Sequence, residues 1–253
     1  MEEKNRAVPF RIKLADIVVG IEPIYSDMEV YCREYITEET ADFNIKIEES
    51  DIDFERVRSK KEAEKEGREV VEYSDSYLET LAVYRQIAEK LPMYNTFLFH
   101  GSAIAVDDRG YLFTAKSGTG KSTHTRLWRE YFGERAIMVN DDKPLLKVST
   151  NGVRVYGTPW DGKHRLSNNV SVQLKAVCIL VRDDVNHIEE ISAGEAYQML
   201  LQQSYRPLDK KAVVQTLTLL DILKEHVKFY RLGCNMDPEA AKVAYCGMNG
   251  GCI

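Results

Sequence analysis

The sequence predicts an α/β fold with a mixed β-sheet. Short apolar segments alternate along the chain with segments of helical periodicity, which is typical of this class. Several neighbouring strand-like segments are separated only by turn residues, which favours hairpins over a purely parallel sheet. The spacing of apolar residues predicts that the last quarter of the chain is mainly helical. We therefore expect a β-rich N-terminal region over residues 1–92, packed on a core over residues 93–253 that ends in helices.

Composition and charge argue against several classes of protein. The 253 residues are 44% hydrophobic and 29% charged, which suits one large globular domain or two small ones. A net charge of −6 argues against a nucleic-acid partner, although a local basic patch stays open. The chain begins without a signal-like segment, and no apolar run approaches the roughly 20 residues of a membrane span. None of the five cysteines has C-x-x-C spacing; Cys178 is expected in the core, and Cys234, Cys246 and Cys252 are expected to be free thiols, with a zinc or thiol role as the alternative. We expect a cytoplasmic protein with no membrane partner.

Two segments near the start of the sequence alternate apolar and polar residues, and a highly charged segment follows them. FRIKLADIVVGI (residues 10–21) and FNIKIEE (residues 43–49) alternate apolar and polar positions, as half-buried strands do. Residues 48–72 are crowded with charge, which favours a solvated hairpin or mobile loop; a docking surface is the alternative. Residues 76–91 have helical spacing, and Pro92 ends that helix.

The elements of the second part follow in a regular order. NTFLFHGSAIA (residues 95–105) and YLFTA (residues 111–115) read as two strands of a hairpin around a turn at 106–110. After a helix that starts near residue 121, four further strands are expected: residues 136–140, 144–148, 153–160 and 176–182. The remainder is predicted as two helices (194–204 and 210–226), a strand (228–233) and a last helix (238–245).

Residues 115–122 read AKSGTGKS and fit the phosphate-loop pattern G-x-x-x-x-G-K-[ST], with Ala115 in place of the first glycine. The two glycines allow the backbone to turn its N–H groups toward phosphate oxygens, and the helix that follows points its positive end at the same anion. Lys121 would reach the outer phosphates, and the Ser122 hydroxyl would bind Mg²⁺. An incidental glycine-rich turn is the alternative. The predicted nucleotide-binding residues are Ser117, Gly118, Thr119, Gly120, Lys121, Ser122 and Thr123.

Two adjacent carboxylates follow the strand at residues 136–140. Neighbours in a strand point to opposite sides, so Asp141 and Asp142 can serve one site only if the strand has ended or twists there. One could then hold Mg²⁺, and the other could take the proton from an attacking hydroxyl. A simple turn is the alternative. His100 ends an apolar segment opposite the turn at 106–110, where it could assist proton transfer or touch a phosphate, although spacing alone favours a structural role.

The segment GTPWDGKHR (residues 157–165) combines turn formers with an acid and several bases. It could be a surface turn. It could equally be a substrate or metal loop, with Asp161 on Mg²⁺ and Lys163 or Arg165 holding an anion. Spacing alone does not choose between the two.

In this order, FHGSAIA, AKSGTGKST and VNDD resemble the catalytic domain of the HPr kinase/phosphorylase family. SGTGKS is also similar to the phosphate loop of ATP-dependent phosphoenolpyruvate carboxykinases, which share that fold. The resemblance covers residues 95–165, extends loosely to the C-terminal helices and hardly touches residues 1–75. It implies that Lys121 and Ser122 bind the triphosphate and Mg²⁺, that Asp142 is the base and Asp141 supports the metal, and that His100 is the active-site histidine.

The sequence also departs from that family. HPr kinases carry a Glu-Ile-Arg-Gly stretch that supplies a metal-binding glutamate, and this chain has none; Asp161 in GTPWDGK would substitute for it. The signature that docks the carrier-protein substrate is also absent from the sequence. The resemblance therefore implies an HPr-kinase-related P-loop kinase, not HPr kinase itself. Relatives of this kind include kinases that phosphorylate a serine of a ribosomally made peptide.

The functional expectation is a Mg²⁺-dependent kinase that transfers the γ-phosphoryl group of ATP to a hydroxyl of a peptide, protein or small molecule. The alternative is a non-catalytic nucleotide-binding regulator or chaperone-like module. A carboxykinase-like enzyme is less favoured, because the chain is about half the expected length and shows no second cluster of site residues. GTP or pyrophosphate as the donor stays open. HPr kinases assemble as hexamers, so the resemblance also allows a homo-oligomer.

Overall fold

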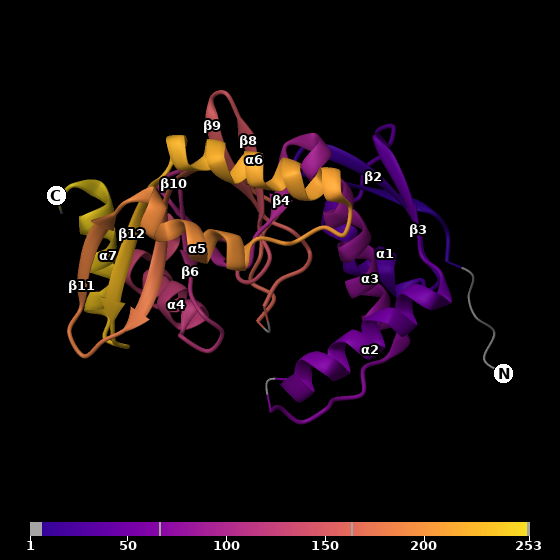
Figure 1. The fold of residues 1–253 in the computed structure, drawn as a ribbon, viewed down its shortest axis with the longest axis horizontal. Helices are drawn as coiled ribbons and strands as arrows, with labels where there is room; N and C mark the ends of the chain where they lie inside the picture. The colour runs from indigo at the N-terminus through magenta and orange to yellow at the C-terminus, as the bar shows by residue number, and fades with distance from the viewer. Residues whose placement is uncertain (1–6, 66, 163, 252–253) are drawn as a thin grey trace. The chain divides into compact units, whose positions relative to one another are not determined.

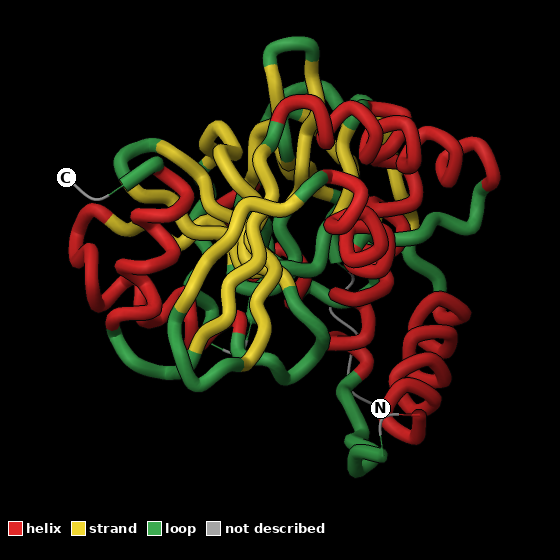
Figure 2. The backbone as a smooth tube through the Cα atoms, turned by 60° about the vertical axis from the view of Figure 1, so that its left-hand side comes forward, coloured by secondary structure: helices red, strands yellow, loops and turns green. Residues whose placement is uncertain are grey.

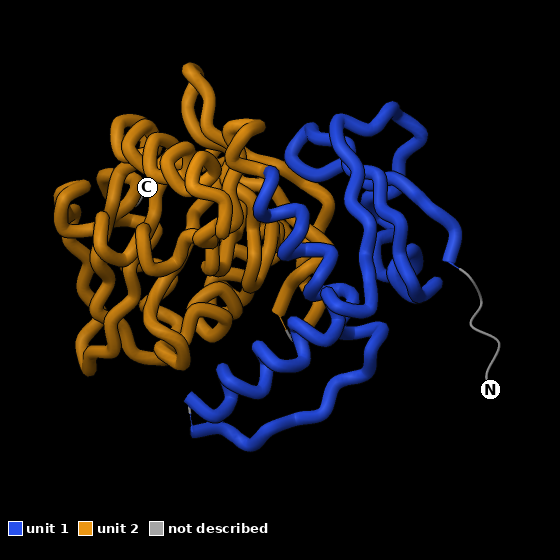
Figure 3. The backbone as a smooth tube through the Cα atoms, turned by 45° about the vertical axis from the view of Figure 1, so that its right-hand side comes forward, with its two compact units in different colours: residues 1–90 blue, residues 91–253 orange. Residues whose placement is uncertain are grey.

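The computed structural model describes residues 7–65, 67–162 and 164–251. The chain forms two compact units, Met1–Lys90 and Leu91–Ile253, which are described one at a time (Figure 3). Among the described residues, no helix is both long and apolar enough to cross a membrane.

The first unit contains a three-stranded sheet in the order β1-β2-β3. Its strands are β1 (Phe10–Leu14), β2 (Ile17–Glu22) and β3 (Phe43–Lys46). The first two form an antiparallel hairpin, in which Ala15 and Asp16 make the tight turn with φ angles of 48° and 60°. The third strand runs parallel to β2, which lies in the middle of the sheet and has five of its six residues buried. The two strand segments expected here are therefore confirmed.

Helices make up more of this unit than its sheet does, so the expectation of a β-rich region is wrong. The helices are α1 (Asp27–Tyr31), the short 3₁₀ turn η1 (Arg33–Tyr35), α2 (Glu49–Lys65) and α3 (Asp75–Lys90). The charged stretch expected as a hairpin or loop is largely α2. Its sequence has few apolar positions, so the periodicity that normally reveals a helix is weak.

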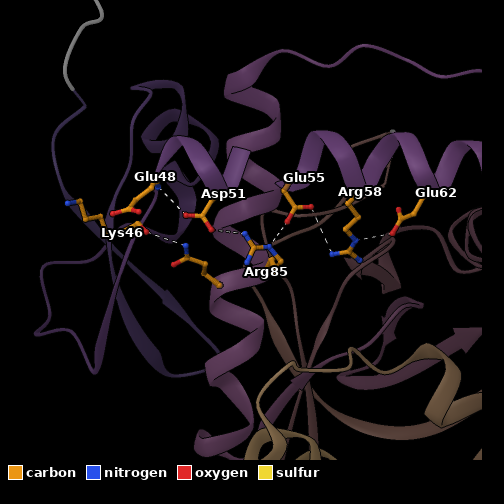
Figure 4. A network of polar contacts seen from close by, with 8 residues as sticks. Lys46, Glu48, Asp51, Glu55, Arg58, Glu62 and Arg85 are labelled. Atoms are coloured by element: carbon orange, nitrogen blue, oxygen red, sulfur yellow. Dashed lines mark hydrogen bonds and ion pairs between the residues drawn. The ribbon is translucent and has the colours of Figure 1, made fainter. Parts of the chain in front are cut away.

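Paired charges compensate for the small apolar face of α2 (Figure 4). Arg85 of α3 donates hydrogen bonds to Asp51 (2.8 Å) and Glu55 (2.5 Å), two acids one turn apart on α2. Further along the same helix, Arg58 bonds to Glu62 at 3.0 Å, an i,i+4 pair that supports helical structure. The helix is thus held to α3 by an arginine between two carboxylates.

The second unit is built on a nine-stranded mixed sheet in the order β4-β8-β9-β10-β6-β5-β7, with β12 added beside β10 and β11 beside β12 (Figure 1). Its central strand β10 runs parallel to β6 and β12 and antiparallel to β9, so the expected mixed sheet is confirmed. The strands are β4 (Thr96–Leu98), β5 (Ser102–Val106), β6 (Arg109–Thr114), β7 (Ala136–Asn140), β8 (Leu145–Ser149), β9 (Gly152–Tyr156), β10 (Ser171–Arg182), β11 (His187–Ile191) and β12 (Lys228–Cys234).

Helices cover both faces of this sheet, which Figure 2 shows as strands between helices. Alternate residues of β10 divide the core: Val177 and Ile179 pack with α5 and α6, whereas Cys178 and Leu180 pack with α4 and α7. The helical elements of the unit are η2 (Leu91–Tyr94), α4 (Lys121–Phe132), η3 (Gly133–Arg135), α5 (Ala193–Gln203), α6 (Lys210–His226) and α7 (Glu239–Asn249).

Two strand predictions in this unit need correction. Residues 95–105 form two strands rather than one, since β4 pairs with β8 while β5 pairs with β6 and β7. The strand is interrupted between β4 and β5, at His100 and Gly101. A Cβ added to Gly101 would lie 3.0 Å from the Phe113 carbonyl oxygen. Strand β11 was not predicted, because three of its five residues are exposed and only one is fully buried.

The expectation of free thiols also fails at one position. Cys246 lies within α7 and is disulfide-bonded. Cys32, Cys178 and Cys234 are free, and the first two are buried among apolar side chains. Burial raises the pKa of the Cys178 thiol, so this residue is an unreactive core side chain.

Candidate functional site

The glycine-rich loop connects a buried strand to a helix. It leaves β6 after Thr114 and enters α4 at Lys121, and no side chain caps the N-terminus of that helix. Gly118 and Gly120 have φ angles of 75° and 121°, conformations that L side chains rarely adopt. An added Cβ on Gly118 would meet nothing within 4 Å, so backbone conformation rather than lack of space requires glycine there. The N–H groups at the start of α4 consequently have no capping side chain as acceptor.

Ala115, which replaces the first glycine of the pattern, is fully buried. It belongs to the apolar cluster that includes Phe113 and Trp128, so its methyl group packs against the core behind the loop. The departure from the pattern is therefore accommodated by packing on the side of the loop away from solvent.

An arginine from another strand holds the tip of the loop. The Arg182 guanidinium, at the end of β10, donates to the carbonyl oxygens of Gly118 and Thr119. Within the loop, the Thr119 hydroxyl donates to the Lys116 carbonyl at 2.8 Å. Sequence reasoning missed Arg182, which is 64 residues from the glycine that it contacts and carries no local signal of this role.

Lys121 begins α4 and is partly buried. Burial lowers the pKa of its ammonium group, and the negative charges of Asp142 and Asp141 oppose that shift. Among the described residues, none makes an ion pair or hydrogen bond with this ammonium group. Lys121 is thus a partly desolvated cation that the described part of the chain leaves without a contacting anion.

The two aspartates lie in a bend directly after β7, where the strand has already ended. Asn140 shapes this bend: its side-chain oxygen accepts from the N–H groups of Asp142 (2.9 Å) and Lys143 (2.6 Å). Its amide nitrogen donates to the Trp160 carbonyl at 3.2 Å. The condition for both carboxylates to serve one site, an interrupted strand, is therefore met.

Asp141 points into the protein and is buried. Its Oδ1 accepts a hydrogen bond of 2.7 Å from the Ser102 hydroxyl, which lies 3.1 Å from the Thr125 hydroxyl of α4. Its Oδ2 lies against Gly162, where a Cβ would approach to 2.7 Å. Glycine at position 162 therefore keeps the space beside this oxygen open.

Asp142 pairs with His100, whose Nε2 lies 3.1 Å from its Oδ1. Burial alone raises the pKa of Asp142, but the hydrogen bond from His100 and the charges of Lys143, His100 and Lys121 outweigh it. The pKa of Asp142 consequently lies below its usual value, and the carboxylate is ionised at neutral pH. Lys143 approaches the other oxygen at 3.8 Å.

Backbone contacts position His100 at the break between β4 and β5. Its N–H donates to the Gln203 carbonyl at 2.7 Å, and its own carbonyl accepts from the Thr114 hydroxyl at 3.2 Å. The next residue, Gly101, donates to the Asp142 carbonyl at 3.1 Å. The histidine, the end of β6 and the aspartate bend are thus joined at one edge of the sheet.

The loop after β9 brings Asp161 to the same edge. Asn168 closes this loop by donating from its side chain to the Met138 carbonyl at 2.8 Å. Burial and the charge of Asp141 raise the pKa of Asp161, while the Ser167 N–H, 3.1 Å from its Oδ2, opposes the rise. Of the predicted anion-holding pair, Arg165 is exposed with a φ of 46°, and Lys163 lies outside the described residues.

The predicted site residues therefore gather at one edge of the second unit, around the start of α4 and the end of β7. Sequence reasoning missed four that contribute to it: Ser102, Thr125, Gly162 and Arg182. Within the described part of the chain, no group of three or more His, Cys, Asp or Glu side chains is arranged to hold a metal ion.

Comparison with known proteins adds a distant likeness only. No family model matches the chain, and no curated protein matches it either. Among solved structures, the chain is similar to the Hpr(Ser) kinase/phosphatase from Coxiella burnetii, with 15% sequence identity. The match covers 51% of this chain and 92% of that one, with a TM-score of 0.28. This indicates a distant relation at most.

Proposed function

We propose that the protein is a Mg²⁺-dependent kinase that transfers the γ-phosphoryl group of ATP to a hydroxyl acceptor. The observation that carries this proposal is the partly buried Lys121, which begins an uncapped helix and has no contacting anion among the described residues. Leaving a cation desolvated is unfavourable unless an anion binds there. A phosphate chain satisfies Lys121 and the helix N-terminus together.

The loop would hold the nucleotide phosphates with backbone and side-chain groups together. Backbone N–H groups of the loop and of the first turn of α4 would surround the phosphate oxygens, and Lys121 would contact the outer phosphates. Arg182 would keep the loop in this shape through the carbonyl groups of Gly118 and Thr119. The residues assigned to the nucleotide are Ser117, Gly118, Thr119, Gly120, Lys121, Ser122 and Thr123.

Ser122 and Asp141 would hold Mg²⁺, with Asp161 beside them. The residues suit this ion, because Mg²⁺ takes oxygen ligands and usually binds one or two carboxylates together with substrate phosphates. The space that Gly162 leaves next to Asp141 Oδ2 fits a ligand at this oxygen. When bound, Mg²⁺ neutralises charge on the phosphoryl oxygens.

Asp142 would act as the base. Its lowered pKa keeps it ionised, so it can accept the proton of the acceptor hydroxyl as that oxygen bonds to the γ-phosphorus. The bond between the γ-phosphorus and the β–γ bridging oxygen breaks, and ADP leaves. His100 would orient the carboxylate through its contact of 3.1 Å. The acceptor class proposed is a serine of a peptide or protein, or a small-molecule alcohol.

The test uses purified protein, γ-labelled ATP, Mg²⁺ and a metabolite and peptide extract, with Lys121→Ala as the blank. Label should appear on one acceptor, disappear with Lys121→Ala and fall by at least about a hundredfold with Asp142→Asn. Intact transfer by Asp142→Asn would contradict the base assignment. Label that stays on ATP while nucleotide binding is measurable would favour the non-catalytic regulator.

A further inference from the structure

Three polar side chains from separate elements meet in the buried core beneath the site. Ser102 begins β5, Thr125 lies in the second turn of α4, and Asp141 follows β7. Their exposed fractions are 0%, 1% and 5%. Buried polar groups are costly unless they are hydrogen-bonded, so this cluster is expected to have a defined arrangement of donors and acceptors.

The chemistry of the three groups sets the order of the contacts. An ionised carboxylate only accepts hydrogen bonds, so the Ser102 hydroxyl donates to Asp141 at 2.7 Å. The Ser102 oxygen can then accept from Thr125, 3.1 Å away. The single proton of the Thr125 hydroxyl is then donated to Ser102, and the carbonyl oxygens of Lys121 and Ser122, 3.3 Å away, are its alternative acceptors. The hydrogen bonds therefore run from Asp141 through Ser102 to Thr125, one turn from the start of the helix.

We propose that Ser102 and Thr125 are positioning residues that tie Asp141 to the start of α4, so that metal binding and nucleotide binding are energetically coupled. This inference rests on the proposed function, since it assigns Asp141 to the metal and the start of α4 to the phosphates. The coupling is reciprocal: bound nucleotide raises the affinity for the metal by the same factor as bound metal raises the affinity for nucleotide.

Two matched substitutions isolate the hydroxyl of Thr125. Thr125→Val keeps the side-chain shape and removes the hydroxyl, whereas Thr125→Ser keeps the hydroxyl and removes a methyl group. Thr216 offers a control, because it is also buried in a helix of the same unit and its hydroxyl donates to the Ala212 carbonyl at 2.8 Å. Thr216→Val therefore repeats the chemical change away from the site.

The experiment measures free Mn²⁺ by electron paramagnetic resonance, with and without ADP, for the wild-type protein and each variant. In the wild-type protein ADP should tighten Mn²⁺ binding. In Thr125→Val this tightening should fall by about tenfold, the loss expected for one hydrogen bond to a charged network. Thr125→Ser should retain most of it, and Thr216→Val should match the wild-type protein. Ser102→Ala combined with Thr125→Val should lose no more than Ser102→Ala alone.

If ADP tightens Mn²⁺ binding equally in Thr125→Val and Thr216→Val, the inference is overturned. It is also overturned if the double variant Ser102→Ala, Thr125→Val loses the sum of the two single losses of tightening. The pattern also separates this inference from the proposed function. Phosphoryl transfer with unchanged coupling in Thr125→Val refutes the positioning role and leaves the kinase proposal standing. Coupled Mn²⁺ and ADP binding that depends on Thr125, without transfer to any acceptor, supports the positioning role and refutes the kinase proposal. A wild-type protein in which ADP does not tighten Mn²⁺ binding contradicts the inference directly.

Discussion

The two units treat similar charged side chains in opposite ways. In the first unit, Arg85 is mostly buried, and its guanidinium is bonded to both Asp51 and Glu55. In the second unit, Lys121 is also partly buried, yet among the described residues no group contacts its ammonium group. The first arrangement is complete within the chain. In the second arrangement the described residues supply no anion, and this difference is one observation behind our proposal that the second unit binds a ligand.

Asp161 of the second unit is a second charged group that burial disfavours. Burial raises the pKa of Asp161, as it lowers that of Lys121, so both groups are moved toward their neutral forms. Such groups reduce stability in the free protein and are tolerated where a ligand later stabilises the charge.

Removing the charge of Lys121 should abolish phosphoryl transfer without lowering the stability of the protein. Lys121→Met keeps much of the side-chain stem and removes the charge. We expect phosphoryl transfer to fall on the order of a thousandfold, with an unchanged or slightly higher midpoint in urea denaturation. A large loss of stability would instead show that Lys121 has a structural partner, and the contrast with Arg85 would fail.

Removing the charge of Arg85 in the first unit should instead lower the stability of the protein. Arg85→Ala leaves two carboxylates close together on α2, and Glu55 is almost fully buried. Breaking a buried pair in this way typically costs about 3 kcal/mol of unfolding free energy. Circular dichroism during urea denaturation measures the loss. Restoration by Arg85→Lys should be partial, because lysine cannot bridge the two acids with a planar fork. A neutral effect of Arg85→Ala would contradict the contrast.

The His100–Asp142 pair predicts a change in pH dependence. The hydrogen bond from His100 lowers the pKa of Asp142, so His100→Ala should raise that pKa. The base is active only when it is ionised, and the acidic limb of the rate profile should therefore move to higher pH. At neutral pH, where the carboxylate stays ionised, we expect a separate loss of about tenfold because the contact that orients it is removed. His100→Gln, which retains a donor, should restore part of the profile. An acidic limb that does not move would show that His100 does not set the pKa of the base.

Asp161→Asn should give the smallest effect, with opposite signs for stability and function. The folded-state pKa of Asp161 is raised, so its contribution to stability is present below the unfolded-state pKa and is lost as pH rises through the folded-state value. Asparagine should therefore stabilise the protein at neutral pH, by less than about 1 kcal/mol. The gain should shrink toward pH 3 in thermal melts. Higher stability together with unchanged dependence on Mg²⁺ would exclude Asp161 from the metal site.

Local sequence patterns determined much of the second unit. The strands at residues 136–140 and 228–233, the helix at 210–226 and the loop at 115–122 all show periodicity or glycine spacing within a short window, where local propensity is decisive. The glycine spacing of the loop predicted a role for Lys121, and the apolar strand at 136–140 placed the aspartate pair at its end. The helix α2 lacks such a pattern because it has few apolar positions, and its contact with Arg85, 30 residues from Glu55, gives no local signal.

Only the tertiary structure decided how the site residues meet. Ser102 lies 39 residues from Asp141, and Arg182 lies 64 residues from Gly118. Local propensity carries no information about contacts at these separations, which arise when β5, β6 and β10 pair and set their ends at one edge. Motif spacing alone predicted which side chains would bind phosphate and accept a proton, and these roles stay predictions. The packing of the sheet determined that Asp142 faces His100 while Asp141 turns inward to Ser102, because the bend after β7 gives the two carboxylates different partners.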